Sequence, residues 1–363
     1  MFHIIVNPTG ASGRTGKYWK KLAPLFEGAE IEVHYSTPGH SIEQICRELT
    51  DTGDGEGAGK STDLVYLVIV GGDGSINEAI NGIQDFKRAR VALIPSGSGN
   101  DLARDLGLPT NDRKLVDTIL AAKVQHHLDV GEVIYHDDAP VTANANAHDG
   151  APVTVNPNAP DRAAGSTHRF IVSSGIGFDA AVCEAVANAP LKGILNKIYL
   201  GKLIYLAQAL RLIFSNEASE GTIRAEESAA EVFASSATEA AAAKDRVLNA
   251  GGELRINRLT FAAAMNHRFE GGGFMFAPKA KATDGQLNLC VLHDIRVPAF
   301  FRLFPQAYSG AHVRHTQYVA MLESPSFRVQ TRDPMWVHCD GEVSRQSRDV
   351  SFRTTGDKLL MIV

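Results

Sequence analysis

The chain has 363 residues, a formal net charge of −5 and an ordinary globular composition, with 44% hydrophobic and 21% charged residues. This length is typical of two domains, and the apolar content is enough for a core in each. The slightly acidic balance argues against a general nucleic-acid-binding protein, because such proteins normally carry a strongly basic face. Nothing approaches the ~18 consecutive apolar residues of a membrane span, and the first apolar run is too short for a signal peptide. We therefore expect a cytoplasmic protein.

The cysteines give a further indication of the compartment. Cys46, Cys183, Cys290 and Cys339 are far apart and form no CxxC pair. Scattered cysteines in a chain of this size are typical of buried thiols in a reducing environment.

Residues 1–127 alternate between strand and helix signals. Apolar runs predict strands over residues 2–6, 31–37, 63–70 and 90–95. The segments between them predict helices over residues 17–26, 41–49, 75–83 and 101–106. Ser41 and Gln44 have the spacing of a capping box at the start of the second helix. Such alternation is typical of a parallel sheet with helices on both faces, so we expect an α/β domain.

From residue 128 the pattern changes to strands with short turns. Strand-like runs cover residues 128–136, 168–179, 255–267, 286–295, 326–331, 335–343 and 349–363. We expect a mainly antiparallel β domain over residues 128–345, interrupted by a helix over 191–214. A final strand over residues 346–363 is expected to pack back on the first domain. The composition of residues 137–166 and 226–244 is typical of surface inserts.

Three glycine-rich loops follow strands of the first domain, over residues 7–14, 71–75 and 95–101. In a parallel sheet these loops leave the carboxyl ends of the strands, which is where ligands bind in open α/β folds. Glycine lets the backbone approach a phosphate closely, and the N–H groups of the following helix start point towards it. We therefore predict a phosphate site where the three loops meet.

An acidic residue stands inside the second loop, Gly71-Gly72-Asp73-Gly74. A carboxylate in a phosphate-facing turn repels the ligand unless a metal ion lies between them. A carboxylate, Mg²⁺ and phosphate oxygens are a standard arrangement for phosphoryl transfer. The loop therefore predicts a kinase that uses ATP and Mg²⁺.

Longer stretches resemble a known family. NPTGASGR (residues 7–14), VIVGGDGSINEAINGI (68–83) and IPSGSGNDLARDLGLP (94–109) are similar to the diacylglycerol kinase catalytic domain of bacterial lipid kinases, relatives of sphingosine and ceramide kinases. GIGFDA (175–180), FEGGGFMFAPKAKATDGQLNL (269–289) and CDGE (339–342) continue the resemblance in the same order. It implies an α/β domain of the NAD kinase and phosphofructokinase type, followed by a mainly antiparallel β-sandwich domain.

The resemblance also implies which residues bind ATP. In the family, the GGDG turn and the following helix start hold the phosphates, and the neighbouring loops and a threonine contribute. The implied set is Asn7, Pro8, Thr9, Gly10, Ser12, Gly13, Thr37, Gly71, Gly72, Asp73, Gly74, Ser75, Asn77, Ser98, Gly99, Asn100 and Asp101. Asp101 would join Asp73 in the Mg²⁺ network, and it can also act as a first-turn acid of its helix.

The late DGE segment implies the general base, which takes the proton of the lipid hydroxyl as the γ-phosphoryl group arrives. Asp340 and Glu342 are both candidates, and a spacing of two on a strand would put them on one face. The resemblance also implies a structural Mg²⁺ site with Asp284 as side-chain ligand and backbone oxygens near Lys281 and Gln286. A DG pair between strands is equally typical of a hairpin turn.

The resemblance therefore implies an ATP-dependent lipid kinase that meets its substrate at the inner membrane surface, with diacylglycerol giving phosphatidic acid as the first candidate reaction. An NAD kinase-like enzyme shares GGDG and is one alternative. A non-catalytic nucleotide- or lipid-binding regulator of the same fold is another. We expect no nucleic-acid partner, and exposed sheet edges are compatible with a homodimer.

Overall fold

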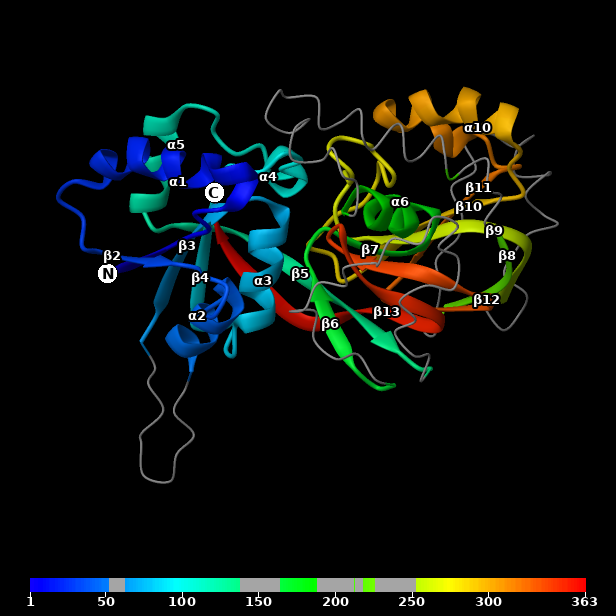
Figure 1. Cartoon of the computed structure of the whole chain (residues 1–363), viewed down its shortest axis with the longest axis horizontal. Coiled ribbons are helices and arrows are strands. Elements are labelled where there is room, and N and C mark those ends of the chain that lie inside the picture. The colour runs from blue at the N-terminus through cyan, green and yellow to red at the C-terminus, as the bar shows by residue number, and fades with distance from the viewer. Residues whose placement is uncertain (52–62, 138–163, 188–211, 213–217, 226–252) are drawn as a thin grey trace.

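A computed structural model describes residues 1–51, 63–137, 164–187, 212, 218–225 and 253–363. The first half alternates strands and helices (Figure 1), which are β1 Phe2–Val6, α1 Gly10–Leu22, η1 Ala23–Phe26, β2 Ile31–Tyr35, α2 Ile42–Thr50, β3 Val65–Gly71, α3 Asp73–Gly82, β4 Ala89–Pro95, α4 Asp101–Leu106 and α5 Asp112–Leu120. The second half contains β5 Val124–Tyr135, β6 Thr167–Phe170, β7 Ser173–Gly177, α6 Phe178–Ala187, β8 Ser219–Ala225, β9 Glu253–Met265, β10 Leu287–His293, α10 Val297–Leu303, η3 Phe304–Ser309, η4 Ala311–Arg314, β11 Val319–Ser324, β12 Ser326–Cys339 and β13 Glu342–Ile362. The predicted helix over residues 191–214 and most of the two predicted inserts lie outside the described residues.

The first half is a three-layer α/β unit. β4, β3, β1 and β2 are parallel neighbours in that order. α2 and α3 cover one face, where Ile45 and Ile80 share a core with Leu67. α1 and α5 cover the other face, where Trp19 and Val68 share a second core. Figure 1 shows helices on both sides of this sheet, so the predicted α/β domain is confirmed.

Two helices begin earlier than their patterns predict. α1 starts at Gly10 rather than at Lys17, so much of the expected first loop is already helical. α3 starts at Asp73 rather than at Ser75, which places the acid of the GGDG turn in the first turn of the helix. Gly74 is accommodated inside the first turn of α3, whereas Ala11 and Gly13 near the start of α1 have positive φ angles of 50° and 83°, so that turn is irregular.

α2 and α5 each begin after a residue whose side chain caps the helix. The N–H of Gln44 donates to Ser41 Oγ, and the N–H of Ser41 donates to the Gln44 side chain, so the predicted capping box is confirmed. α5 was not predicted, although Asn111 caps it by accepting the N–H of Lys114 at 3.0 Å. The sequence therefore contained a signal for the start of α5, namely Asn111.

The second half consists mainly of antiparallel strands. β11, β10, β9, β7, β12 and β13 follow one another in that order, and β5, β6 and β8 pair beside them. Phe170, Phe327 and Phe352 are fully buried in the core that these strands enclose. α6 and α10 cover the outer face, where Phe178 lies against Phe300. The sequence predicted a strand through residue 179, but α6 begins at residue 178.

One long strand belongs to both halves. β13 has 21 residues; Val350 pairs with Val329 of β12, whereas Met361 pairs with Val91 of β4 in parallel. The predicted boundary after residue 345 therefore falls inside a continuous strand. The last residues do return to the first half, and Figure 1 shows the C-terminus among the strands of that half.

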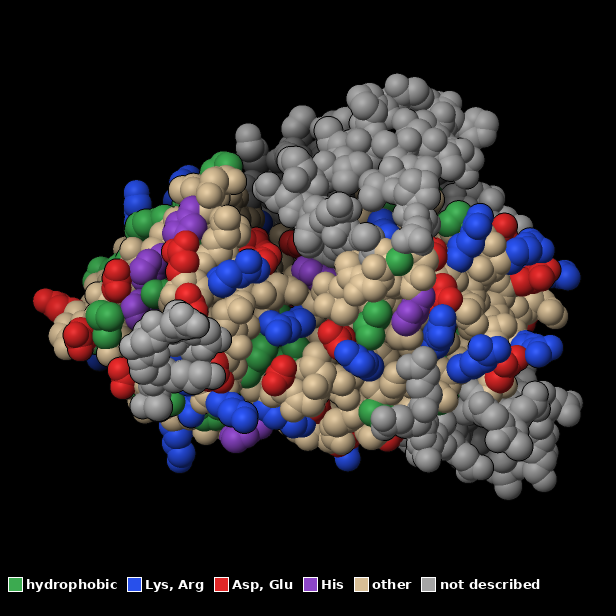
Figure 2. Space-filling model, turned by 90° about the horizontal axis from the view of Figure 1, so that it is seen from below, with side chains coloured by type: hydrophobic (Ala, Val, Ile, Leu, Met, Phe, Trp, Pro, Cys, Tyr) green, Lys and Arg blue, Asp and Glu red, His purple; other side chains and the backbone are tan. Residues whose placement is uncertain are grey.

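The surface and the thiols complete the description. No helix in the described part of the chain is long and apolar enough to cross a membrane. The face in Figure 2 shows Lys and Arg interspersed with Asp and Glu rather than one basic field. All four cysteines are free, and Cys46, Cys290 and Cys339 are buried as expected.

Candidate active site

The three glycine-rich loops lie together at the carboxyl edge of the parallel sheet. β1, β3 and β4 are neighbours, so their loops leave at the same edge. The N–H of Ser96 donates to the carbonyl oxygen of Gly71 at 2.8 Å. The hydroxyl oxygens of Thr15 and Ser96 are 2.9 Å apart. These bonds join the third loop to the second loop and to α1.

The second and third loops touch at two glycines. A Cβ on Gly97 would lie 2.6 Å from the Cα of Gly72, and a Cβ on Gly72 would lie 2.8 Å from the Cα of Gly97. Asn100 closes the third loop, because its Oδ1 accepts the N–H of Gly97 at 2.9 Å and its Nδ2 donates to the carbonyl of Gly97 at 3.0 Å. Both positions require glycine, since the two backbones approach too closely for any side chain.

Gly97→Ala is expected to lower the thermal unfolding midpoint by about 2–10 °C, because overpacking costs roughly 1–3 kcal/mol. Gly39→Ala is the matched control, since nothing lies within 4 Å of its Cβ. Differential scanning calorimetry of the two variants checks this. An unchanged midpoint for Gly97→Ala would show that the two loops are not in backbone contact.

Asp73 and Asp101 converge beside Gly99. A Cβ on Gly99 would lie 3.0 Å from Asp73 Oδ2 and 3.4 Å from Asp101 Oδ2. Asp73 also accepts the N–H of Asp101 at 3.1 Å and the N–H of Leu102 at 3.3 Å. The first N–H groups of α4 are therefore bonded to Asp73 and do not point at a phosphate, which corrects our expectation for the third loop.

Asp101 is buried and Asp73 is half-buried, and the two carboxylates lie near like charge. Burial, followed by the charge of Asp101, raises the pKa of Asp73. Burial also raises the pKa of Asp101, although the N–H of Gly272 and the guanidinium of Arg104 oppose the rise. A divalent cation would offset this negative charge, and carboxylate oxygens are the ligands that Mg²⁺ prefers. The donor set therefore fits the predicted Mg²⁺, with Asp73 and Asp101 as the residues that would hold it.

Most of the other predicted ATP residues lie in or beside the same loops. Asn7 Oδ1 accepts the N–H groups of Thr9 at 3.2 Å and Gly10 at 3.0 Å, which shapes the first loop. Thr37 follows β2 in an exposed turn, where it exchanges backbone hydrogen bonds with His40. The remaining residues of the set at this edge are Pro8, Ser12, Gly13, Gly74, Ser75 and Ser98.

Asn77 is the exception among the predicted ATP residues. Its side chain is 1% exposed, and its Nδ2 donates to Asp340 Oδ2 at 2.8 Å and to the carbonyl of Arg169 at 3.0 Å. Its Oδ1 lies 3.1 Å from His168 Nε2. The amide is engaged on both sides, so the structure places Asn77 behind the loops rather than among groups that face a nucleotide.

Asp340 lies in the turn between β12 and β13, with φ 48°, and not on a strand. Its Oδ1 accepts the N–H groups of Val172 at 2.8 Å and Ser173 at 2.9 Å. Its Oδ2 accepts the N–H of Ile171 at 2.9 Å in addition to the amide of Asn77. The expectation that Asp340 and Glu342 share one strand face is therefore wrong.

Glu342 has different surroundings. It is exposed and begins β13. A Cβ on Gly74 would lie 2.9 Å from Glu342 Oε1, so this carboxylate from the second half lies directly on the GGDG turn of the first half. Both oxygens of Asp340 are occupied by four donors, whereas Glu342 reaches the phosphate loop.

Sequence reasoning missed Arg104 and the role of Gly272. Arg104 forms an ion pair with Asp101 and lies 5.8 Å from the ring centroid of Phe269. The N–H of Gly272 donates to Asp101 Oδ2 at 2.7 Å, which brings the segment of residues 269–274 to the third loop. One signal was available, because Arg104 stands three residues after Asp101 on one helix face.

A buried polar cluster supports the turn that carries Asp340. His338 Nε2 lies 3.2 Å from Asp179 Oδ2 and 3.2 Å from Glu270 Oε1. The N–H of Gly341 donates to His338 Nδ1 at 3.2 Å. Burial disfavours the charged ring, but the carboxylates of Glu270 and Asp179 outweigh burial and hold the pKa of His338 well above its usual value, so Nε2 keeps its proton. A metal ion needs an unprotonated nitrogen, so this cluster orients the turn rather than binding an ion.

The residues of the predicted structural metal site lie in the turn before β10. Asp284 Oδ1 accepts the N–H of Gln286 at 3.1 Å, as in a turn closed by its own aspartate. Lys281 and Asp284 line an open cavity of about 580 Å³ together with Glu323. The turn is thus present, and Mg²⁺ at Asp284 stays a prediction.

Two family models match most of the chain. The diacylglycerol kinase catalytic domain matches residues 1–133, and the YegS C-terminal NAD kinase beta sandwich-like domain matches residues 171–354. The chain belongs to the diacylglycerol kinase-type lipid kinase family. Membership confirms the predicted resemblance and the combination of an α/β domain with a β-sandwich domain.

Individual relatives cover almost the whole chain. A diacylglycerol kinase of Bacillus subtilis is 26% identical over 345 residues, covering 93% of this chain and 88% of the relative. A diacylglycerol kinase of Mycobacterium tuberculosis is 24% identical and covers 70% of this chain and 62% of the relative. A crystal structure of a diacylglycerol kinase from Bacillus anthracis has the same fold, with a TM-score of 0.57 at 16% identity over 99% of this chain and 96% of that chain.

Proposed function

We propose that this chain is an ATP-dependent lipid kinase that transfers the γ-phosphoryl group of ATP to a lipid hydroxyl, with diacylglycerol as the acceptor and phosphatidic acid as the product. The placement of Glu342 carries the proposal. This carboxylate of the second half lies on Gly74, while Asp73 and Asp101 converge beside Gly99. A proton acceptor and a pair of metal-binding acids thus meet between the two halves, as phosphoryl transfer to a hydroxyl requires.

Each group has a separate task in this proposal. The glycine loops bind the ATP phosphates through their backbone, and Asp73 with Asp101 would hold Mg²⁺. When bound, Mg²⁺ neutralises charge on the phosphate oxygens. Glu342 takes the proton of the acceptor hydroxyl, since its carboxylate reaches the loop. Asp340 keeps the turn in place through its four hydrogen bonds.

The lipid is proposed to be met at a membrane surface. Phe301 is 43% exposed on α10, and Tyr308 is 50% exposed on the adjoining η3. Arg302 stands beside Phe301 in the chain. Aromatic rings next to a basic side chain suit the boundary between acyl chains and anionic headgroups.

A labelling experiment tests the function. The purified full chain is incubated with γ-labelled ATP, Mg²⁺ and, in separate reactions, micelles of diacylglycerol, a sphingoid base or phosphatidylglycerol, or NAD in buffer. We expect label in the organic phase, and mass analysis is expected to identify phosphatidic acid. Label in NADP would instead establish the NAD kinase alternative. ATP binding without transfer to any acceptor would establish the non-catalytic regulator.

A further inference from the structure

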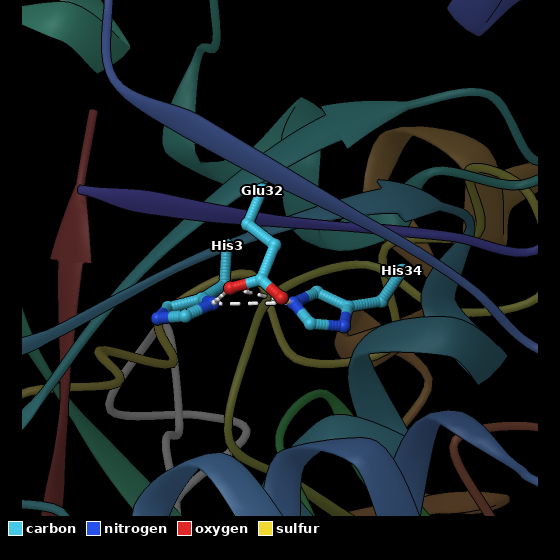
Figure 3. Close-up of side chains that lie close together, drawn as sticks. All are labelled: His3, Glu32 and His34. Carbon is cyan, nitrogen blue, oxygen red and sulfur yellow. Dashed lines mark hydrogen bonds and ion pairs between the residues drawn. The ribbon is translucent and has the colours of Figure 1, made fainter.

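A second cluster of polar side chains lies outside the glycine loops, on the first two strands of the parallel sheet. β1 and β2 pair in register, with His3 opposite Glu32 and Ile5 opposite His34. Opposite residues of parallel strands share a face, and His34 is two residues after Glu32. The three polar side chains therefore project from one face, and Figure 3 shows them converging on a single point.

The distances within this cluster are those of a metal site. His3 Nδ1 lies 3.1 Å from His34 Nε2 and 3.4 Å from Glu32 Oε2. His34 Nε2 lies 3.9 Å from Glu32 Oε2. Ligand atoms around a tetrahedral Zn²⁺ lie ~2.0–2.1 Å from the ion, so they are roughly 3.3 Å from one another. The three donors thus form one face of a tetrahedron of about the right size.

We propose that His3, Glu32 and His34 bind a divalent transition metal ion of the Zn²⁺ class, with water as a fourth ligand. Two imidazoles and one carboxylate are a ligand set that Zn²⁺ prefers and that Mg²⁺ and Ca²⁺ do not. The side chain of Glu32 is 54% exposed, which gives the ion and a water molecule a route from solvent. The side chains of His3 and His34 are only 14% and 21% exposed, so their rings are held by the protein.

The charges around the cluster favour a cation. His3 Nδ1 and His34 Nε2 both face the Glu32 carboxylate, so each ring presents one nitrogen to the centre of the cluster. Glu32 supplies the negative charge, while the neighbouring Glu30 is paired with the α-ammonium group of Met1 at 3.8 Å. In the absence of an ion, one ring N–H donates to the other ring nitrogen, which explains how the cluster is held together without metal.

None of the three residues belongs to the glycine-rich loops. His3 is the second residue of β1, whereas His34 lies beside Ile5, nearer the carboxyl ends of the two strands. Among the strands that the structure describes, β2 is the last of the sheet and pairs only with β1. An ion bound here would join the outermost strand to its neighbour. Figure 2 shows histidine and acidic side chains close together on the surface of this half.

Metal binding to the full chain tests the proposal. After treatment with a chelator, the protein is titrated with ZnCl₂ by calorimetry, and we expect one tight site per chain. Glu32→Gln and His34→Ala are each expected to weaken this binding by about tenfold or more. His40→Ala is the matched control, because His40 is a half-buried histidine that pairs with Glu48 and belongs to no metal-like cluster among the described residues. It is expected to bind like the unsubstituted chain.

Two further measurements distinguish the loss of metal binding from misfolding of a variant. Glu32 is exposed, so Glu32→Gln is expected to keep the metal-free unfolding midpoint. Excess Zn²⁺ is expected to raise the midpoint of the unsubstituted chain and of His40→Ala by about 5 °C or more, but not that of Glu32→Gln. Co²⁺ substitution is expected to give the visible absorption of a tetrahedral site, which the same variant loses.

These binding measurements test the proposed metal site independently of kinase activity. The proposal is overturned if the unsubstituted chain binds no Zn²⁺ above the level of a His3→Ala/His34→Ala double variant. It is also overturned if Glu32→Gln and His34→Ala both bind as tightly as the unsubstituted chain, because the ion would then be held elsewhere among the 13 histidines.

Discussion

Asp73→Asn is expected to lower ATP-dependent phosphorylation at least about 10²–10³-fold, the usual cost of removing one electrostatic stabiliser of a transition state. The asparagine oxygen can still accept an N–H from the start of α4, so the thermal midpoint is expected to change by only a few degrees. Asp73→Ala removes both bonds to α4. It is expected to be equally inactive and less stable. Initial rates with labelled ATP and calorimetry of both variants check this.

The matched control for this prediction is Asp117→Asn. Asp117 is an exposed acid on α5 that pairs with Arg113, and it lies outside the three loops. The phosphorylation rate of Asp117→Asn is expected to equal that of the unsubstituted chain. Undiminished phosphorylation by Asp73→Asn would contradict the proposed metal-binding role and, with it, the proposed kinase site.

Glu342→Gln is expected to lose catalytic activity, whereas Asp340→Ala is expected to lose stability. Glu342→Gln keeps the shape of the side chain but cannot take a proton, so kcat is expected to fall roughly 10²–10⁴-fold with an unchanged unfolding midpoint. Asp340→Ala leaves three backbone N–H groups and the amide of Asn77 without their acceptor. Each buried donor left unpaired costs about 1–3 kcal/mol, so the midpoint is expected to fall by about 10 °C or more.

The comparison of the two variants tests the assignment of the base. Rates are measured at a temperature where both proteins are folded, and folding is followed by circular dichroism. If Glu342→Gln is fully active while folded Asp340→Ala is inactive, the base is Asp340 and our assignment is wrong. If both keep full activity, neither carboxylate acts as the base.

Local features of this fold were predictable because they depend on neighbouring residues. The capping box of Ser41 and Gln44 is complete within four residues. The strand–loop–helix order of the first half follows from short apolar runs and glycines, and the meeting of the three loops follows from parallel pairing. The glycine spacing therefore indicated which edge of the sheet carries the site.

The roles of the two late acids could not be predicted, because they depend on contacts between distant residues. Asp340 takes its hydrogen bonds from Ile171, Val172 and Ser173, and from Asn77 of the other half. No periodicity shows that a turn will be placed over those N–H groups. For the same reason Asn77 resembled a phosphate ligand by its place after GGDG, although its side chain turns towards the second half.

The helix boundaries show a third limit of structure prediction from the sequence. Glycines at positions 10, 13 and 16 predict a loop by their low helix propensity, and α1 begins at Gly10. Ala11 and Gly13 nevertheless have positive φ angles of 50° and 83°, so the start of α1 keeps the left-handed backbone that the glycines indicated. The regular helix, which buries Trp19 and Leu22, follows it.

The pairing of β13 with β4 has a consequence for synthesis of the chain. Met361 meets Val91, so the parallel sheet is completed by a strand that is synthesised long after β4. Until then β4 has an unpaired edge, which is a site for wrong pairing with other chains. Contacts between residues so distant in sequence also form slowly. The first half is therefore expected to reach its final form only after β13 has been synthesised, and its open edge is exposed to wrong pairing during that interval.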